Sequence, residues 1–276
     1  MPALEGKMDV DGWLRTFRAL GTKAQSLARP LAGTAKGRKE LGTGAGGDVT
    51  VYMDRVLEDI LIDKCKRIGN VRLISEELGV RDFGKPELSV IADPLDGSVN
   101  AKSGIALYSV LYAIGPPGPT LGNLRMGYVR NLVSGQEYWA FRGKGAYCDG
   151  KRIHAQKDDA LKILLVELSP VVEKDLRAVM PLMIAATRVR SLGSMALDMC
   201  YAATGAVSGV ADLRGGRLRP LDLSAGKLIL EEAGGLVTGG RGESLDDMSL
   251  DLGNHTDILA AGNPGIHKRL LEARRP

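Results

Sequence analysis

The sequence is poor in cysteine and in aromatic residues. Its three cysteines, Cys65, Cys148 and Cys200, lie far apart and lack the close spacing of zinc ligands. We therefore interpret them as free thiols and expect a protein of the reducing cytoplasm. Only three Phe and two Trp are present, so the basic residues are not interleaved with aromatic rings that could stack on nucleic-acid bases.

Long apolar runs and a strong net charge are also absent. No uninterrupted apolar run reaches the roughly 20 residues that span a bilayer, and we expect no signal peptide at the N-terminus. The net charge of +4 comes from 37 basic and 33 acidic residues among 276, which is too small to indicate nucleic-acid binding. We therefore expect a globular protein that binds neither a membrane nor a nucleic acid.

The pattern of the chain changes near Gln156. Residues 1–155 contain an amphipathic helix, a glycine-rich loop and several strands of antiparallel type, with Asp149-Gly150 as a strong hairpin turn. Residues 156–276 alternate strands with helices, which predicts an α/β second lobe. We therefore expect two lobes with a boundary at 155/156.

The glycine-rich loop, residues 33–47, has two interpretations. It carries six glycines and a basic cluster without any apolar period, so it is either a surface linker or a mobile basic lid over an anionic ligand. Its position directly before a helix that begins near Thr50 favours the lid. We expect Thr50 or Asp48 to cap this helix, Asp54 in its first turns to belong to a site, and Glu58 to face solvent.

Carboxylates follow two predicted strands. The apolar run Val90 to Ala92 ends in Asp93, and Pro94 disfavours a helix there, so we expect Asp93 and Asp96 on a tight turn at a strand end. Two anions held this close repel one another unless a cation lies between them, and hard divalent cations prefer oxygen ligands. Glu76 ends another predicted strand, whereas Asp222 opens a predicted helix, where an acid is usually a first-turn residue.

Four motifs in this order resemble those of the inositol monophosphatase family, which is related to fructose-1,6-bisphosphatases. They are Asp48-Val49-Thr50 with Asp54, Ser75-Glu76-Glu77, Asp93-Pro94-Leu95-Asp96-Gly97-Ser98-Val99-Asn100, and Leu221-Asp222 with Glu232-Ala233-Gly234-Gly235. The resemblance implies an α/β fold of the αβαβα sandwich type, phosphomonoester hydrolysis by metal-activated water, and a homodimer or higher homo-oligomer.

The same resemblance implies a role for each matching residue. Two to three Mg²⁺ ions would be held by Glu76, Asp93, the carbonyl of Leu95, Asp96 and Asp222. Asp54 and Ser98 would orient the attacking water, with Glu76 also reaching a third ion. The expected substrate contacts come from two turns and a basic segment: Gly97, Ser98, Gly193, Ser194, Met195, Arg214 and Arg217.

The substrate is less sharply indicated. The segment that holds Arg214 and Arg217 is similar to the archaeal branch of the family, which often accepts both inositol phosphate and fructose 1,6-bisphosphate. The two arginines could contact a second phosphate or be solvated loop residues. We expect hydrolysis of inositol 1-phosphate, fructose 1,6-bisphosphate or both. The alternatives are a 3′-phosphoadenosine 5′-phosphate phosphatase and a non-catalytic metal-dependent binding protein.

Overall fold

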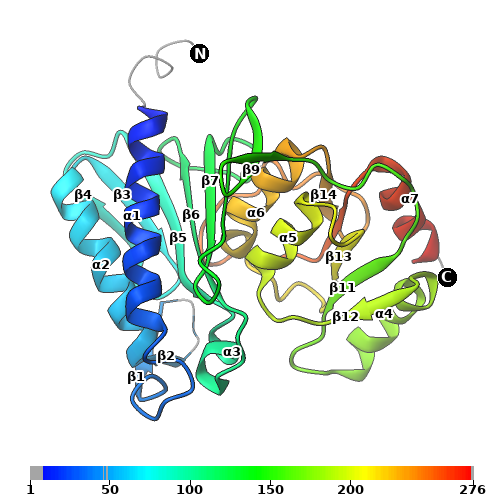
Figure 1. Cartoon of the computed structure of the whole chain (residues 1–276), viewed down its shortest axis with the longest axis horizontal. Coiled ribbons are helices and arrows are strands. Elements are labelled where there is room, and N and C mark those ends of the chain that lie inside the picture. Colours follow the sequence, from blue (N-terminus) through cyan, green and yellow to red (C-terminus); the bar gives the residue numbers. More distant parts are fainter. Residues whose placement is uncertain (1–8, 46, 48, 275–276) are drawn as a thin grey trace.

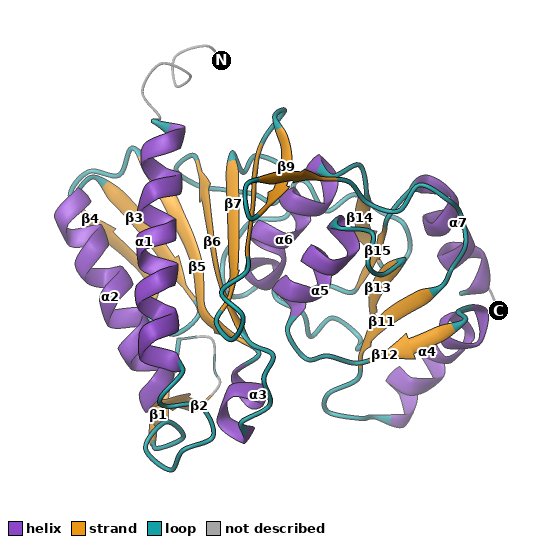
Figure 2. Ribbon diagram, viewed as in Figure 1, coloured by secondary structure: helices purple, strands orange, loops and turns teal. Residues whose placement is uncertain are grey.

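Helices and sheets alternate in five layers (Figure 1; Figure 2). The computed structural model describes residues 9–45, 47 and 49–274. Two helices cover the outer face of a large sheet, two more lie between this sheet and a second one, and a last pair covers the far side. This arrangement confirms the predicted αβαβα sandwich. Among the described residues, no helix is long and apolar enough to cross a membrane.

The large sheet has eight strands in the order β10-β9-β8-β7-β6-β5-β3-β4. Neighbouring strands are antiparallel except for the pair β3 and β5. Asp149 and Gly150 both have positive φ, as a two-residue hairpin turn requires, which confirms the turn predicted there. The strands are β3 Val71–Ser75, β4 Gly79–Phe83, β5 Leu88–Asp96, β6 Ser109–Gly115, β7 Met126–Asn131, β8 Glu137–Phe141, β9 Gly145–Cys148 and β10 Lys151–Ile153.

Helices α1 (Val10–Ala28) and α2 (Tyr52–Ile68) pack on the outer face of the large sheet. Asp9 begins α1, since its side chain accepts a hydrogen bond of 2.9 Å from the Gly12 N–H. Phe17 of α1 packs in a hydrophobic core that α1 shares with α2 and the large sheet. Burial of this apolar stripe, rather than helix propensity alone, holds the layer in place.

The second sheet has five strands in the order β12-β11-β13-β15-β14. Helices α4 (Glu173–Ala185) and α7 (Pro264–Ala273) contact each other on its outer face. The strands are β11 Ile163–Glu167, β12 Arg188–Arg190, β13 Gly209–Asp212, β14 Leu236–Gly239 and β15 Ile258–Ala261. The boundary predicted at 155/156 falls between the two sheets and stays a prediction.

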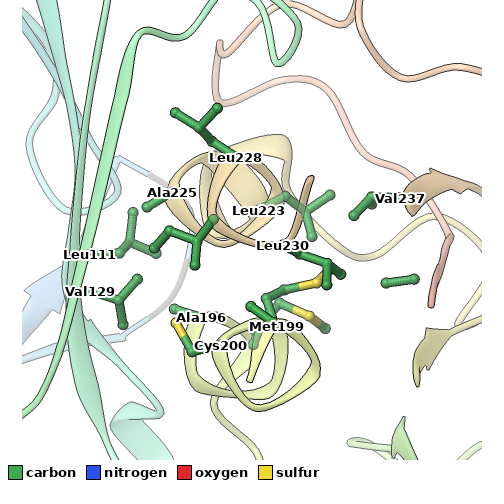
Figure 3. Close-up of a cluster of buried hydrophobic side chains, with 14 of the residues drawn as sticks. Leu111, Val129, Ala196, Met199, Cys200, Leu223, Ala225, Leu228, Leu230 and Val237 are labelled. Atoms are coloured by element: carbon green, nitrogen blue, oxygen red, sulfur yellow. The ribbon is translucent and has the colours of Figure 1, made fainter. Parts of the chain in front are cut away.

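Helices α5 (Met195–Ala203) and α6 (Pro220–Glu232) form the middle layer. Figure 3 shows Leu111 and Val129 of the large sheet on one side of this pair and Val237 of the second sheet on the other. Because both helices are covered from two sides, their residues are buried almost all round, as expected for a core helix. The starts of α5 and α6 are therefore held by the packing of both sheets.

A small hairpin lies beside the large sheet, near the C-terminal end of β5. Strand β1 (Glu40–Thr43) lies within the glycine-rich segment 33–47 and pairs antiparallel with β2 (Val49–Val51), which follows that segment. The expected capping of α2 by Thr50 is wrong, because Thr50 belongs to β2 and Val51 is the N-cap residue. Asp48, the other expected cap, lies outside the described residues. All three cysteines are free thiols.

Candidate active site

The end of β5 is a bulged strand rather than the tight turn that was expected. Asp93 lies opposite Leu111 and Asp96 opposite Ser109, so Pro94 and Leu95 together face one residue of β6. Proline lacks an N–H donor and is tolerated in a sheet mainly at such bulges. The side chain of Asp93 accepts a hydrogen bond of 2.8 Å from the Leu95 N–H, which fixes the bulge next to the site.

Three carboxylates converge beside this bulge. Glu76 follows β3, which runs parallel to β5 with Ser75 paired to Ala92, so it emerges next to Asp93. Asp222 arrives from the first turn of α6. One oxygen of each of the three side chains lies within 4.8 Å of the others.

This cluster fits a bound cation. Burial raises the pKa values of Asp93 and Asp222 well above their ordinary range, and repulsion from Glu76 and Asp96 raises them further. The Oδ1 atom of Asp222 is buried and has no hydrogen-bond partner among the described residues. Mutually repelling carboxylates with a bare buried oxygen are the donor set that hard divalent cations bind.

Asp96 lies near this cluster but directs its carboxylate to the start of α5. It accepts hydrogen bonds from the Met195 N–H at 3.0 Å, the Ala196 N–H at 3.1 Å and the Ser109 hydroxyl at 2.8 Å, and a further one from Ser194. Ser194 is the N-cap residue of α5, but its hydroxyl donates to Asp96 and makes no hydrogen bond to the helix backbone. A role of Asp96 as a cation ligand stays a prediction.

A pocket opens over the carboxylates, with about 330 Å³ of space that includes open solvent. Five of the residues expected in the site line it, together with three that the sequence did not single out for a role. The lining residues are Val49, Asp54, Glu76, Glu77, Asp93, Leu95, Ser98 and Lys102. Lys102 comes from α3 (Ser98–Ser103) and adds a positive charge to an otherwise acidic surface.

Asp54 lies in the first turn of α2, where its carboxylate accepts a hydrogen bond of 2.8 Å from the Val51 N–H. Burial raises its pKa to about 6. Glu58, one turn later, was expected to face solvent, and this expectation is wrong. Glu58 is fully buried and accepts a hydrogen bond of 2.8 Å from the Ser75 hydroxyl. The helix face that carries both acids therefore points into the protein, towards the strand that ends at Glu76.

The turn at Gly97 packs against the segment that precedes α5. Gly97 has φ 83°, and a Cβ added there would lie 3.1 Å from the Gly193 carbonyl oxygen. Asn100 fixes the same contact, because its side-chain amide donates to the carbonyls of Leu107 at 2.9 Å and Leu192 at 2.7 Å. The expected substrate contacts Gly97, Ser98, Gly193, Ser194 and Met195 are therefore neighbours in space.

The two arginines expected near a second phosphate are engaged elsewhere. Arg214 donates to both oxygens of Asp212, at 2.9 and 2.6 Å, and Arg217 forms an ion pair of 2.6 Å with Asp175 of α4. Neither lines the pocket over the carboxylates. Arg219, not singled out from the sequence, forms an ion pair with Glu76, and its place three residues before Asp222 was the signal that could have revealed it.

Comparison with known proteins identifies the family. The profile of the inositol monophosphatase family matches residues 9–276. The fructose-1,6-bisphosphatase/inositol-1-monophosphatase of Methanothermobacter thermautotrophicus is 34% identical over 96% of this chain and 97% of its own. The protein of the same description from Thermococcus kodakarensis is 35% identical, over 89% and 91%.

Solved structures agree with this comparison. A crystal structure described as an inositol monophosphatase–fructose 1,6-bisphosphatase superposes with a TM-score of 0.84 at 28% identity and covers 95% of this chain and 99% of that one. The sequence match and the superposition both extend over nearly the whole chain. The chain therefore belongs to the inositol monophosphatase family and is a phosphoric monoester hydrolase.

Proposed function

We propose that the protein hydrolyses inositol 1-phosphate and fructose 1,6-bisphosphate with the help of two to three Mg²⁺ ions. The observation that carries this proposal is the convergence of Glu76, Asp93 and Asp222 beside the pocket that Glu76 and Asp93 line. The buried Oδ1 of Asp222 adds to it, since it has no hydrogen-bond partner among the described residues. The substrates are those in the names of the archaeal relatives of similar length.

The cation ligands that we propose are the three converging carboxylates, Asp96 and the carbonyl of Leu95. When bound, divalent cations would neutralise these carboxylates, polarise the phosphoryl group and activate water. Lys102 and Ser98 line the same pocket. We propose that the Lys102 charge and the main-chain N–H groups of Ser98 and of Gly97, the residue before it, would bind the phosphate.

Asp54 and Ser98 line the pocket from two different helices and are the groups we propose to orient the attacking water. The ionised carboxylate of Asp54 can accept a proton at its Oδ1 atom, which has no hydrogen-bond partner among the described residues. Its pKa of about 6 gives the ionised form at neutral pH. The alcohol side of the substrate would face Gly193, Ser194 and Met195, with Arg214 and Arg217 farther out.

The test is phosphate release from the purified protein with Mg²⁺ and with EDTA. Inositol 1-phosphate, fructose 1,6-bisphosphate and 3′-phosphoadenosine 5′-phosphate serve as substrates, and kcat/KM ranks them. We expect release from the first two that stops in EDTA and returns with Mg²⁺. Turnover only of the adenosine compound would support the nucleotide alternative, and binding without turnover of all three would support a non-catalytic protein.

A matched pair of variants locates the activity. Asp222→Asn should lose at least 100-fold in kcat, because the cluster loses a ligand. Asp63→Asn changes an exposed acid on α2 that forms a surface ion pair with Lys66, and its activity should equal that of the unchanged protein. Equal activity of both variants would place the reaction elsewhere.

We also propose that the protein is a cytoplasmic homodimer. Size-exclusion chromatography with light scattering measures the oligomeric state.

A further inference from the structure

Arg219 lies between the two elements that supply the carboxylate cluster, the large sheet with Glu76 and Asp93 and helix α6 with Asp222. It is the residue directly before α6, and its side chain is only 13% exposed. The guanidinium Nη1 donates to Oε1 of Glu76, at the end of β3. One charged group thus reaches from the start of the middle helix layer to the edge of the large sheet.

The guanidinium acts on a second carboxylate as well. Its positive charge lowers the pKa of Asp222, against the stronger effect of burial. Arg219 therefore offsets part of the negative charge of a cluster that also contains Asp93. An arginine cannot relieve a conflict by losing its proton, since guanidinium stays charged in proteins.

We propose that Arg219 is an internal counter-ion that competes with the divalent cation for Glu76 and so sets the affinity of the site for that cation. This inference rests on the proposed function, because it requires a cation at the three carboxylates. A cation that takes Glu76 as a ligand must displace a largely buried ion pair, and the displaced guanidinium then repels the cation from close range. Arg219 is a positioning residue in this proposal, not a catalytic one.

The direction of the effect follows from charge. Arg219→Gln removes a positive charge that is paired with the proposed cation ligand Glu76, which should tighten binding about tenfold or more. Without any cation, the same change leaves the carboxylates uncompensated, so the melting temperature in EDTA should fall. Arg219→Lys keeps the charge but not the planar fork that fits a carboxylate, so its affinity should lie between those of the two other proteins.

The experiment is titration of Mg²⁺ and Mn²⁺ into each protein by calorimetry, with melting temperatures in EDTA as a second readout. Arg72→Gln is the matched control, because Arg72 also pairs with a carboxylate, that of Asp82, but does so on the exposed surface of β3. Its cation affinity should stay within twofold of that of the unchanged protein.

Tighter binding in Arg219→Gln, with a lower melting temperature in EDTA, supports the proposal. Equal or weaker binding in Arg219→Gln and Arg219→Lys, while the unchanged protein binds the cation, overturns it and leaves the proposed function intact. Absence of cation binding in the unchanged protein overturns both. If Arg219→Gln does not fold, the affinity of Arg219→Lys alone decides, since the proposal requires it to exceed that of the unchanged protein.

Discussion

Replacing Asp96 by asparagine tests whether this carboxylate holds the start of α5 in place. Its two oxygens accept from two adjacent backbone N–H groups, Oδ1 from Met195 and Oδ2 from Ala196. Asparagine has one oxygen and one NH₂ group, so either side-chain orientation points a donor at one of the two N–H groups. The hydroxyls of Ser109 and Ser194 can rotate to suit an amide, but a backbone N–H cannot.

The magnitude follows from that mismatch. One buried backbone N–H loses its acceptor, which costs about 1–3 kcal/mol of the free energy of unfolding. Guanidinium unfolding in EDTA measures this loss without a contribution from bound cation. Because Asp96 is also a proposed cation ligand, Asp96→Asn should lose turnover together with stability.

Asp93→Asn is the matched control, with the opposite expected sign. Burial and neighbouring carboxylates raise the pKa of Asp93 well above its ordinary range, so its ionised form destabilises the cation-free protein. Burial raises the pKa of Asp96 too, but four hydrogen bonds to its carboxylate oppose that effect. A neutral asparagine still offers an oxygen to the Leu95 N–H and should leave the stability in EDTA equal or higher. Both variants should lose turnover. An Asp96→Asn protein as stable in EDTA as the unchanged protein would refute the reasoning about α5.

Three further changes probe the rest of the site. Because burial raises the pKa of Asp54 to about 6, its ionised form is lost as the pH falls through 6; kcat/KM should decline there, and the small remaining activity of Asp54→Asn should show no such decline. Gly97→Ala forces a Cβ to within 3.1 Å of the Gly193 oxygen, at a residue with positive φ. The free energy of unfolding should fall by about 1–3 kcal/mol in circular dichroism melting, and the activity assay should show a raised KM. The lid hypothesis predicts a raised KM when the three basic residues of the loop, Lys36, Arg38 and Lys39, are changed to alanine. Unchanged kinetics would make the segment a linker.

The resemblance of the motifs to a family brought together residues that no local pattern could join. Glu76 and Asp222 are far apart in sequence, and their contact depends on how α6 enters the space between two sheets. Strand-end reasoning alone placed Glu76 and Asp93 at the ends of two strands, and the parallel pairing of β3 with β5 brings these ends together. The same reasoning did not decide whether Asp222, an acid in the first turn of a helix, belongs to the site.

The errors have local physical causes. Glu58 was placed in solvent because most helical glutamates are exposed, and its burial depends on a partner, Ser75, that belongs to a different element. Pro94 was interpreted as the end of β5, although a bulge lets the strand continue to Asp96. Lys102 gave no signal as a single residue, since its proximity to the acids arises only in the folded chain.

The layered build of the site also has a consequence for folding kinetics. Glu76 and Asp93 belong to the large sheet, whereas Asp222 enters with a helix packed between both sheets, so the complete ligand set exists only after the middle helix layer has packed on the large sheet. Such non-local contacts form late. A divalent cation should therefore slow unfolding strongly and speed refolding little, because it binds the native state and not the transition state that precedes it.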